Sequence, residues 1–373
     1  MKKFTVLIED DWELSGNSLG NVASHQYIPS LIFMKMAKKL GIKLTFMVDV
    51  AQQLEFNKHS DKDPNFRLQK NLWDDSVLLM KEYGFDVQLH LHPQWLNASL
   101  NGDLYYLNSN WNIGKYNPVS QKALIHGAIN YLHNLVRKIA PEYKVRAFKG
   151  GSWGLQPSAN LFHILEDEGI KIVMGVRKGM YIPENGVDYR NLEEELLPYY
   201  PSYTDIRKKS DKKEKIVVIP LQPYKPNLGS LAYLGLDMLN QKLRNKALFK
   251  YYYESQIDDN ILNLAPLDSN KKLTFSLHPY HTHLKIGNQP FRYLKNSFDA
   301  TIRKLQNIDQ TNIPIVIETH TKQFLNHYSD IEKFLIYLKE KYNDLVDFKD
   351  ITTYYNETKE STILATVKET VAE

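Results

Sequence analysis

Two pairs of residues carry the side chains best suited to chemistry: His90 with His92, and Asp10 with Asp11. The segment Asp86–Pro93 around the histidines alternates as a strand does, and residues two apart on a strand point to the same face. His90 and His92 could therefore grip one ion. Ligation by these two histidines and one aspartate leaves a fourth position open for water, as in a catalytic zinc site. The alternative is that both histidines lie on a solvated face of a sheet.

More histidines gather where strands are expected to end. Six of the 12 histidines lie at or just past the carboxyl ends of predicted strands: His90, His92, His278, His281, His283 and His320. The first predicted strand ends in Glu9, Asp10 and Asp11, so carboxylates reach the same rim. Carboxylate and imidazole are ligands for a borderline divalent metal such as zinc. Adjacent residues of a strand face opposite sides. If the chain curls at the end of the strand, one of Asp10 and Asp11 could be a metal ligand and the other a general base. A solvated strand terminus is the alternative.

The elements that must position these residues alternate between strand and helix along the chain. β-Branched and aromatic runs predict strands at Phe4–Ile8, Lys43–Val50, Phe85–Leu91, Val145–Phe148, Ile170–Val176, Ile216–Leu221, Lys272–His278 and Ile313–Glu318. Helical patterns lie near Ser30–Leu40, Gln69–Tyr83, Pro118–Ile139, Ser158–Glu168, Phe291–Ile308 and Ile331–Tyr342. This alternation predicts parallel strands joined by helical crossovers, and eight strand candidates favour an α/β barrel over an open sheet.

Long segments interrupt this pattern without dividing the chain. We expect one barrel domain over residues 1–355, with insertions at about 95–117, 178–215 and 224–266, and a polar extension at 356–373. Loops at the carboxyl ends of barrel strands build the site, and long loops in compact domains are usually functional or disordered. The basic run Arg207–Lys215 could attract a phosphate, although such runs are more often solvated loops.

Composition narrows the function classes. The net charge of +4 is too small to indicate a nucleic-acid or membrane surface. The absence of cysteine from the 373 residues excludes disulfides, thiolate zinc ligands and a cysteine nucleophile. No stretch reaches the ~18 apolar residues of a membrane span, and the apolar run after Lys3 is too short for a signal peptide. We expect a cytoplasmic protein that binds no nucleic acid; its oligomeric state stays open.

Four short motifs, in order, resemble those of the polysaccharide deacetylases of the NodB homology type. They are Ile8–Glu13 with its paired aspartates, Gln88–Pro93 with its two histidines, Phe148–Gly154, and Leu277–Pro279. The resemblance implies a distorted barrel of seven or eight βα units and a bound divalent metal, usually zinc. It also implies a hydrolase of carbon–nitrogen bonds, which removes an N-acyl (acetyl) group from an amino sugar or glycan precursor in surface-polysaccharide biosynthesis.

Carried over residue by residue, the resemblance assigns roles to four side chains. Asp10 is the general base toward water at the metal, and His278 is the general acid that protonates the leaving amine. Asp11 is a metal ligand, and so is His90.

The chain departs from the family pattern at two positions of the site. The family's second metal-binding histidine lies four residues after the first, where this chain has Gln94, so we take His92 as the second ligand. The arginine that orients the base corresponds to Lys149, which cannot reproduce a bidentate guanidinium fork.

Further residues are expected to contact the substrate. Gly151 lets the backbone approach closely, and Trp153 offers an aromatic face to a sugar ring. His281 and His320 complete this group, and His281 could replace His278 as the acid. Two alternatives stay open: a metal-dependent amidohydrolase acting on a non-sugar amide, and a non-catalytic carbohydrate-binding relic of the fold.

Overall fold

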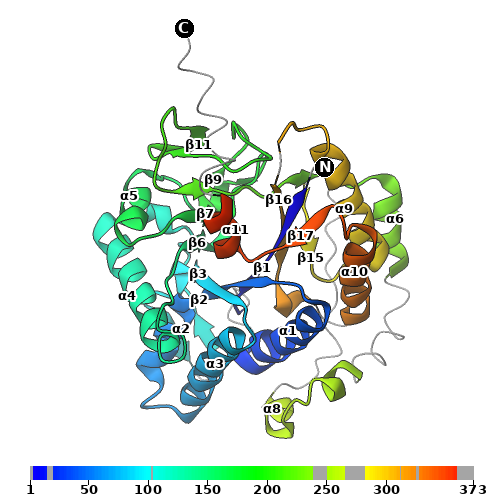
Figure 1. Cartoon of the computed structure of the whole chain (residues 1–373). Helices are drawn as coiled ribbons and strands as arrows, with labels where there is room; N and C mark the ends of the chain where they lie inside the picture. Colours follow the sequence, from blue (N-terminus) through cyan, green and yellow to red (C-terminus); the bar gives the residue numbers. More distant parts are fainter. Residues whose placement is uncertain are drawn as a thin grey trace.

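A parallel β-sheet curled into a distorted barrel organises the molecule (Figure 1). The computed structural model describes residues 3–14, 20–101, 104–237, 250–264, 282–310, 312–324 and 327–358. Within them the sheet has nine strands in the order β12-β7-β6-β3-β2-β1-β16-β15, with β17 also paired to β1. The bounds are β1 Phe4–Trp12, β2 Leu44–Asp49, β3 Asp86–Leu91, β6 Ala147–Gly150, β7 Ile172–Met174, β12 Val217–Val218, β15 Lys285–Ile286, β16 Ile313–Thr319 and β17 Val346–Phe348.

Helices cover the outside of this sheet and carry the chain from one strand to the next (Figure 1). They are α1 Ile28–Leu40, α2 Val50–His59, α3 Pro64–Glu82, α4 Pro118–Val136, α5 Ala159–Asp167, α6 Leu228–Asp237, α8 Asp259–Leu264, α9 Phe291–Leu305, α10 Tyr328–Lys341 and α11 Ile351–Thr358. The fold class predicted from the sequence, a distorted (β/α) barrel, is confirmed.

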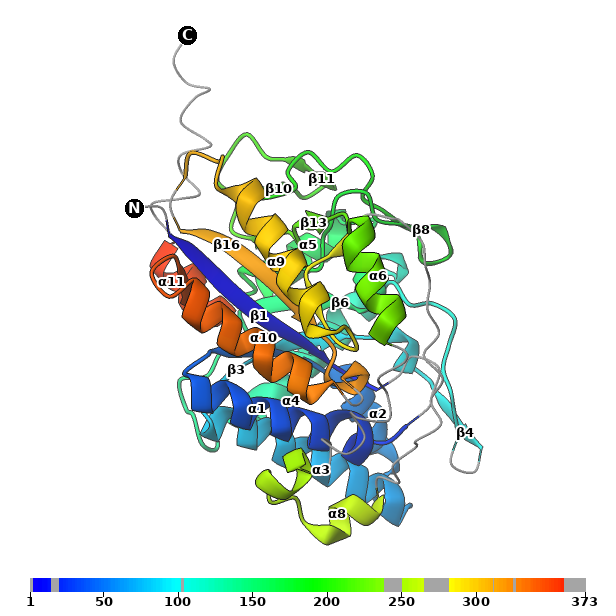
Figure 2. The ribbon, with the colours of Figure 1, turned by 90° about the vertical axis from the view of Figure 1, so that its right-hand side faces the viewer.

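Strand β1 is an inner strand of the sheet and positions the acidic residues of the site. It pairs in parallel with β2 on one side and β16 on the other, and all nine of its residues are buried. Burial on both faces is typical of parallel sheets covered by helices. Figure 2 shows β1 and β16 running side by side along their length. The acidic end of β1 is therefore held inside the molecule rather than at a solvated terminus.

Local signals set the ends of several helices. Pro64 starts α3 while the side chain of Asp63 accepts a hydrogen bond from the Asn65 backbone N–H. Asn117 caps α4 through the N–H of Ser120. Gly41 ends α1 with φ +64°, a left-handed conformation that glycine adopts without strain.

The predicted strands within the described residues are all present, whereas four helices, α2, α6, α8 and α11, were not predicted from the sequence. Helix α2 follows β2 directly, and α11 lies beside the amino-terminal end of β1 (Figure 2). The backbone N–H of Ile351 in α11 donates a hydrogen bond to Oγ1 of Thr45. The last residues of α11 fall within the predicted extension at 356–373. The predicted strand Lys272–His278 lies outside the described residues. No helix among the described residues is long and apolar enough to cross a membrane.

The three insertions contain short hairpins and helices. The first insertion contains the hairpin of β4 Ser99–Asn101 and β5 Leu104–Tyr106. The second contains two hairpins, β8 Tyr181–Ile182 with β9 Val187–Asp188 and β10 Pro201–Ser202 with β11 Asp205–Lys209. The third begins at β13 Pro223–Tyr224, which pairs with β14 Thr282–His283, and contains helices α6 and α8. The basic run is ion-paired at the surface, with Arg207 to Asp205 at 2.8 Å and Lys215 to Glu166 at 2.6 Å. These pairs favour the solvated interpretation of that run.

Candidate metal and catalytic site

Alternation along β1 sends its acidic side chains to two different places. Glu9 pairs in register with Glu318 of β16, and Asp10 pairs with Thr319. Glu9 and Asp11 are two residues apart on β1 and face the same side, where both contact Lys149, and Glu13 follows just past the end of the strand. Asp10 faces the opposite side. The site is built from the first set.

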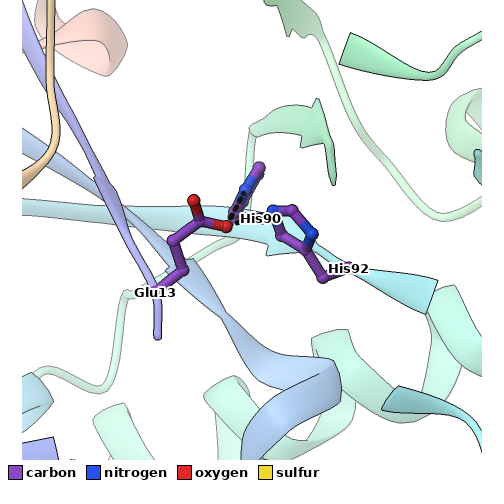
Figure 3. Close-up of side chains that lie close together, drawn as sticks. All are labelled: Glu13, His90 and His92. Carbon is purple, nitrogen blue, oxygen red and sulfur yellow. Dashed lines mark hydrogen bonds and ion pairs between the residues drawn. The ribbon is translucent and has the colours of Figure 1, made fainter. Parts of the chain in front are cut away.

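The first cluster consists of Glu13, His90 and His92 (Figure 3), and we call it the histidine cluster. All three residues are buried, and their ligand atoms lie within 4.8 Å of one another. Oε2 of Glu13 is 3.3 Å from Nε2 of His90 and contacts Nε2 of His92 closely. The carboxylate oxygen thus points between the two rings, so that one oxygen and two imidazole nitrogens converge on one point.

Hydrogen bonds on the far side of each ring orient the two histidines. Nδ1 of His90 lies 2.9 Å from the backbone oxygen of Lys149. Nδ1 of His92 faces the side-chain amide of Gln94, 3.1 Å from its Oε1 and 2.9 Å from its Nε2. A proton on each Nδ1 leaves both Nε2 atoms free as ligands, as is usual for metal-binding histidines. The residue at the family's usual histidine position, Gln94, thus supports a ligand instead of being one.

Charge within the histidine cluster favours an ion pair when no metal is present. Burial raises the pKa of Glu13, but His92 and Lys322 outweigh it and hold that pKa well below its ordinary value. Burial lowers the pKa of His92, while Glu13 and Asp49 raise it above its ordinary value overall. Nζ of Lys322 lies 2.6 Å from the second oxygen of Glu13. The ion pairs with His92 and Lys322 therefore favour the ionised form of the Glu13 carboxylate.

Asp49, at the end of β2, adds another buried carboxylate beside this cluster. Its Oδ1 accepts a hydrogen bond from the backbone N–H of His92 at 3.1 Å. Its Oδ2 is buried and makes no hydrogen bond within the described residues. Burial raises its pKa, and the nearby His92 and His90 partly offset this rise. A buried polar atom without a partner needs an explanation, and an absent ion or water is one.

The second cluster consists of Asp11, Glu318 and His320, with Lys149 at its centre, and we call it the lysine cluster. Nζ of Lys149 lies 2.8 Å from Oδ1 of Asp11, 2.9 Å from Oε2 of Glu318 and 2.7 Å from Oε1 of Glu9. Nε2 of His320 is 3.4 Å from Oδ2 of Asp11. A second contact of His320, 3.7 Å to Oε1 of Glu13, joins the two clusters.

The lysine cluster already holds its own cation. Burial lowers the pKa of Lys149, but Asp11, Glu318 and Glu9 outweigh this and raise it well above its ordinary value. Burial raises the pKa of Glu318, yet Lys149 and His283 bring it well below its ordinary value. Burial keeps the pKa of Glu9 well above its ordinary value despite Lys149. The three carboxyl groups around Lys149 therefore favour its charged form.

The structure does not bring Asp10, the predicted general base, to the histidines. Its carboxylate accepts hydrogen bonds from Oγ1 of Thr319 at 2.6 Å, the backbone N–H of Thr321 at 2.8 Å and Oγ1 of Thr321 at 3.1 Å. Burial raises its pKa to about 6, although these donors lower it. Asp11, the predicted metal ligand, contacts Lys149 and His320, and Glu13 takes the carboxylate position beside the histidines.

The predicted substrate-binding residues divide into described and undescribed ones. A Cβ at Gly151 would lie 2.7 Å from Cγ of His92, so only glycine fits against that ring. Nε1 of Trp153 donates to Glu318 at 3.2 Å, and His320 belongs to the lysine cluster. The predicted acid His278 and the candidate His281 lie outside the described residues.

Sequence reasoning missed Glu13, although a signal for it was present. Glu13 lies two residues after Asp11, and the alternation that joins His90 with His92 also places these two acids on one face. Trp111 was also missed. Its ring meets that of His92 edge to face at 6.0 Å, and nothing in the local sequence indicates this contact.

Comparisons with known proteins support the fold. No family model and no curated protein matches the sequence. A candidate glycoside hydrolase/deacetylase from Parabacteroides distasonis superposes with a TM-score of 0.52 at 13% identity, over 96% of this chain and 73% of that one. Candidate polysaccharide deacetylases from Mycobacterium smegmatis (TM-score 0.49, 10% identity, 96% and 91% coverage) and Pseudomonas aeruginosa PAO1 (0.48, 12%, 96% and 92%) were also found. At 13% identity, the likeness to the Parabacteroides structure shows the fold alone, which is the deacetylase-type distorted barrel.

Proposed function

We propose that this protein is a metal-dependent hydrolase that removes an N-acyl group, in the first place acetyl, from an amino sugar or glycan precursor. The observation that carries the proposal is the convergence of Glu13, His90 and His92 at the carboxyl ends of β1 and β3. The deacetylase-type barrel and the order of the sequence motifs support it. A cytoplasmic location and a role in surface-polysaccharide biosynthesis stay predictions.

The histidine cluster fits a divalent metal. Glu13, His90 and His92 would hold it, and two imidazoles with one carboxylate suit zinc. The backbone oxygen of Lys149 and the side chain of Gln94 orient the two rings without a bound ion. Oδ2 of the nearby Asp49 is buried and makes no hydrogen bond among the described residues. When bound, such a metal polarises a carbonyl and makes water a stronger nucleophile.

We assign the general base to Asp11 rather than Asp10. Asp11 shares the interior face of β1 with Glu13, and Lys149 holds its Oδ1 in place. Its Oδ2 faces His320, which also approaches Glu13, so this oxygen lies beside the histidine cluster and can accept a proton there. Asp10 has both oxygens engaged by threonines on the other face of the strand. His278 remains the predicted acid.

Metal content of the purified protein tests the site. We expect about one zinc per wild-type chain by plasma mass spectrometry, and its loss in His92→Ala and Glu13→Gln. His126→Ala is the matched control, since that histidine is exposed on α4 and pairs with Glu168 at 3.0 Å. Metal retained in both cluster variants would contradict the ligand assignment.

A panel of N-acylated sugars and non-sugar amides tests the reaction. Acetate released from amino sugars, and lost with the metal, would support the deacetylase. Turnover of non-sugar amides alone would favour the amidohydrolase alternative. A protein that binds zinc and sugars but releases no acid from any compound would favour the non-catalytic relic.

A further inference from the structure

Lys285 is a cation beside the lysine cluster that belongs to neither cluster. It lies on β15 and pairs in register with Glu318 of β16, which in turn pairs with Glu9 of β1. Residues paired in register on parallel strands carry their side chains on the same face, so Lys285 points to the same side of the sheet as these two acids. Its side chain is 23% exposed, whereas that of Lys149 is 1% exposed. Lys285 is therefore the ammonium that a ligand can reach.

No carboxylate among the described residues forms a close ion pair with Lys285. The nearest acidic oxygen there, Oε1 of Glu318, is 4.0 Å from its Nζ, which is beyond hydrogen-bonding distance. That oxygen already lies 3.0 Å from Nε2 of His283, and Oε2 of Glu318 is 2.9 Å from Nζ of Lys149. Burial lowers the pKa of Lys285, although Glu318 and Asp11 counter this. An anionic ligand would offset the remaining cost of burying the ammonium.

Two imidazole nitrogens near Glu318 and Lys285 also lack partners. Nδ1 of His283 and Nδ1 of His320 are buried and make no hydrogen bond among the described residues. Nδ1 of His320 is 3.7 Å from the same oxygen of Glu318 that His283 contacts. Burial lowers the pKa of both rings, which favours neutral imidazoles that can hydrogen-bond to hydroxyl groups. A polar ligand beside Lys285 would account for these unpaired atoms.

Arg177 adds a further positive charge to this region. Burial lowers its pKa and Glu318 raises it, which places the guanidinium near that carboxylate. In contrast, burial holds the pKa of Glu9 well above its ordinary value, which favours the neutral form of this acid. Lys285 and Arg177, together with the Lys149 ammonium, therefore exceed the negative charge of the carboxylates in the lysine cluster. Such a region attracts an anion rather than a second cation.

His320 connects this region to the histidine cluster. Its Nε2 is 3.7 Å from Oε1 of Glu13, and its Nδ1 is 3.7 Å from Oε1 of Glu318. Burial lowers the pKa of His320, Lys285 lowers it further, and Glu13 raises it, so the ring lies within the electrostatic reach of both residues. One imidazole ring and one carboxylate thus separate Lys285 from a proposed metal ligand. Lys285 belongs to the surroundings of the proposed metal and not to a separate surface.

We propose that Lys285 binds an anionic group of the substrate, a carboxylate or a phosphate, so that the amino sugar that this protein deacylates is an acidic one. This inference rests on the proposed function. It assigns charge selectivity to β15, a strand that supplies none of the proposed metal ligands. Both anions form the same charge-assisted hydrogen bond with an ammonium, and the probes below distinguish them.

A set of sugars matched in shape and differing in charge tests the proposal. The probes are N-acetylglucosamine, its 6-phosphate, N-acetylglucosaminuronic acid and the corresponding uronamide, which keeps the shape of the acid without its charge. Each is titrated into zinc-loaded protein by calorimetry, with acetate release measured in parallel. Lys285→Met removes the ammonium and keeps an unbranched side chain. Lys304→Met is the matched control, since Lys304 is 43% exposed on α9 and pairs with Glu195 at 2.8 Å.

We expect wild type to bind an acidic probe more tightly than its neutral counterpart by roughly tenfold or more, as a charge-assisted hydrogen bond allows. This ratio should fall to about one in Lys285→Met and stay unchanged in Lys304→Met, with equal zinc content showing that both variants are folded. Preference for the uronic acid over the uronamide would assign a carboxylate. Preference for the 6-phosphate over N-acetylglucosamine would assign a phosphate.

Three results would overturn the inference: equal binding of acidic and neutral probes, no binding of either acidic probe, or a preference that Lys285→Met retains. The last result would place the anion on the metal or on another cation. Charge-selective binding without acetate release from any probe would count against the deacetylase proposal and not against the anion site.

Discussion

The histidine cluster and the lysine cluster use similar residue types in adjacent places, yet they differ in what neutralises their acids. In the lysine cluster, the Lys149 ammonium contacts three carboxylates at 2.7–2.9 Å. In the histidine cluster, one carboxylate oxygen faces two imidazoles whose other nitrogens are already engaged. His320 of the lysine cluster links the two clusters, since its Nε2 lies 3.4 Å from Asp11 and 3.7 Å from Glu13 of the histidine cluster.

This difference separates two ways of stabilising acidic side chains inside a protein. Burying a charge costs several kcal/mol unless a partner compensates for it. In the lysine cluster the compensating cation is Lys149, a residue of the chain itself. The cluster therefore needs no added ion, and Lys149 can hold Asp11 in a fixed position. In the histidine cluster, Lys322 occupies only the outer oxygen of Glu13, and the other oxygen with two imidazole nitrogens forms a donor set that an exchangeable cation completes. Metal content, stability and turnover should therefore respond differently to changes in the two clusters.

The largest effect is expected from removing the proposed base. Asp11→Asn should lower kcat by roughly 100- to 10,000-fold, the usual contribution of a general base. The variant should keep its zinc, because Asp11 is not in the histidine cluster. Asp10→Asn is the matched comparison and should stay within a few-fold of wild type. A greater loss in Asp10→Asn than in Asp11→Asn would return the base to Asp10.

Removing the Lys149 ammonium should cause the largest loss of stability. Lys149→Met leaves buried acids uncompensated, and breaking a buried ion pair this way costs about 3–5 kcal/mol. Urea unfolding of the apoprotein measures this cost. Lys285→Met is the control, since its ammonium is 4.0 Å from Glu318 and its side chain is partly exposed. Equal losses in the two variants would show that Lys149 is not the organising charge.

The pH dependence of stability should report Asp10 separately from both clusters. Burial raises its pKa to about 6 from 3.8, so ionisation is easier in the unfolded chain. Its contribution is present below pH 3.8 and is lost as the pH rises through 6, a loss of about 3 kcal/mol at pH 7.

The measurement is the unfolding free energy of apoprotein from pH 4 to pH 7, for wild type and Asp10→Asn. The decline over this range should be smaller in Asp10→Asn. Asp86→Asn should reduce the decline similarly, because burial also raises the pKa of Asp86 to about 6. An unchanged profile in Asp10→Asn would contradict the burial of an ionisable carboxyl at this position.

The smallest predicted effect concerns the orientation of His92. Gln94→Ala removes the partner of Nδ1, and loss of such outer partners weakens metal binding by roughly 10- to 100-fold. Competition with a zinc chelator measures the affinity. Gln121→Ala, a buried amide that braces the loop before α4, is the control and should leave the affinity within a few-fold. Equal affinity in wild type and Gln94→Ala would show that the ring needs no support.

Local pattern in the sequence determined the strands, the barrel class and the pairing of His90 with His92, because strand alternation depends only on neighbouring residues. The same alternation could have predicted that Glu13, two residues beyond Asp11, lies on the same side as Asp11. Only the tertiary structure decided which acid each histidine meets, because that depends on the register of β1 against β16 and on where β3 ends. The role of Lys149 was likewise beyond local pattern, since its partners Glu9 and Glu318 lie 140 and 169 residues away along the chain. A long flexible side chain selects its partners by the charges that folding brings within reach.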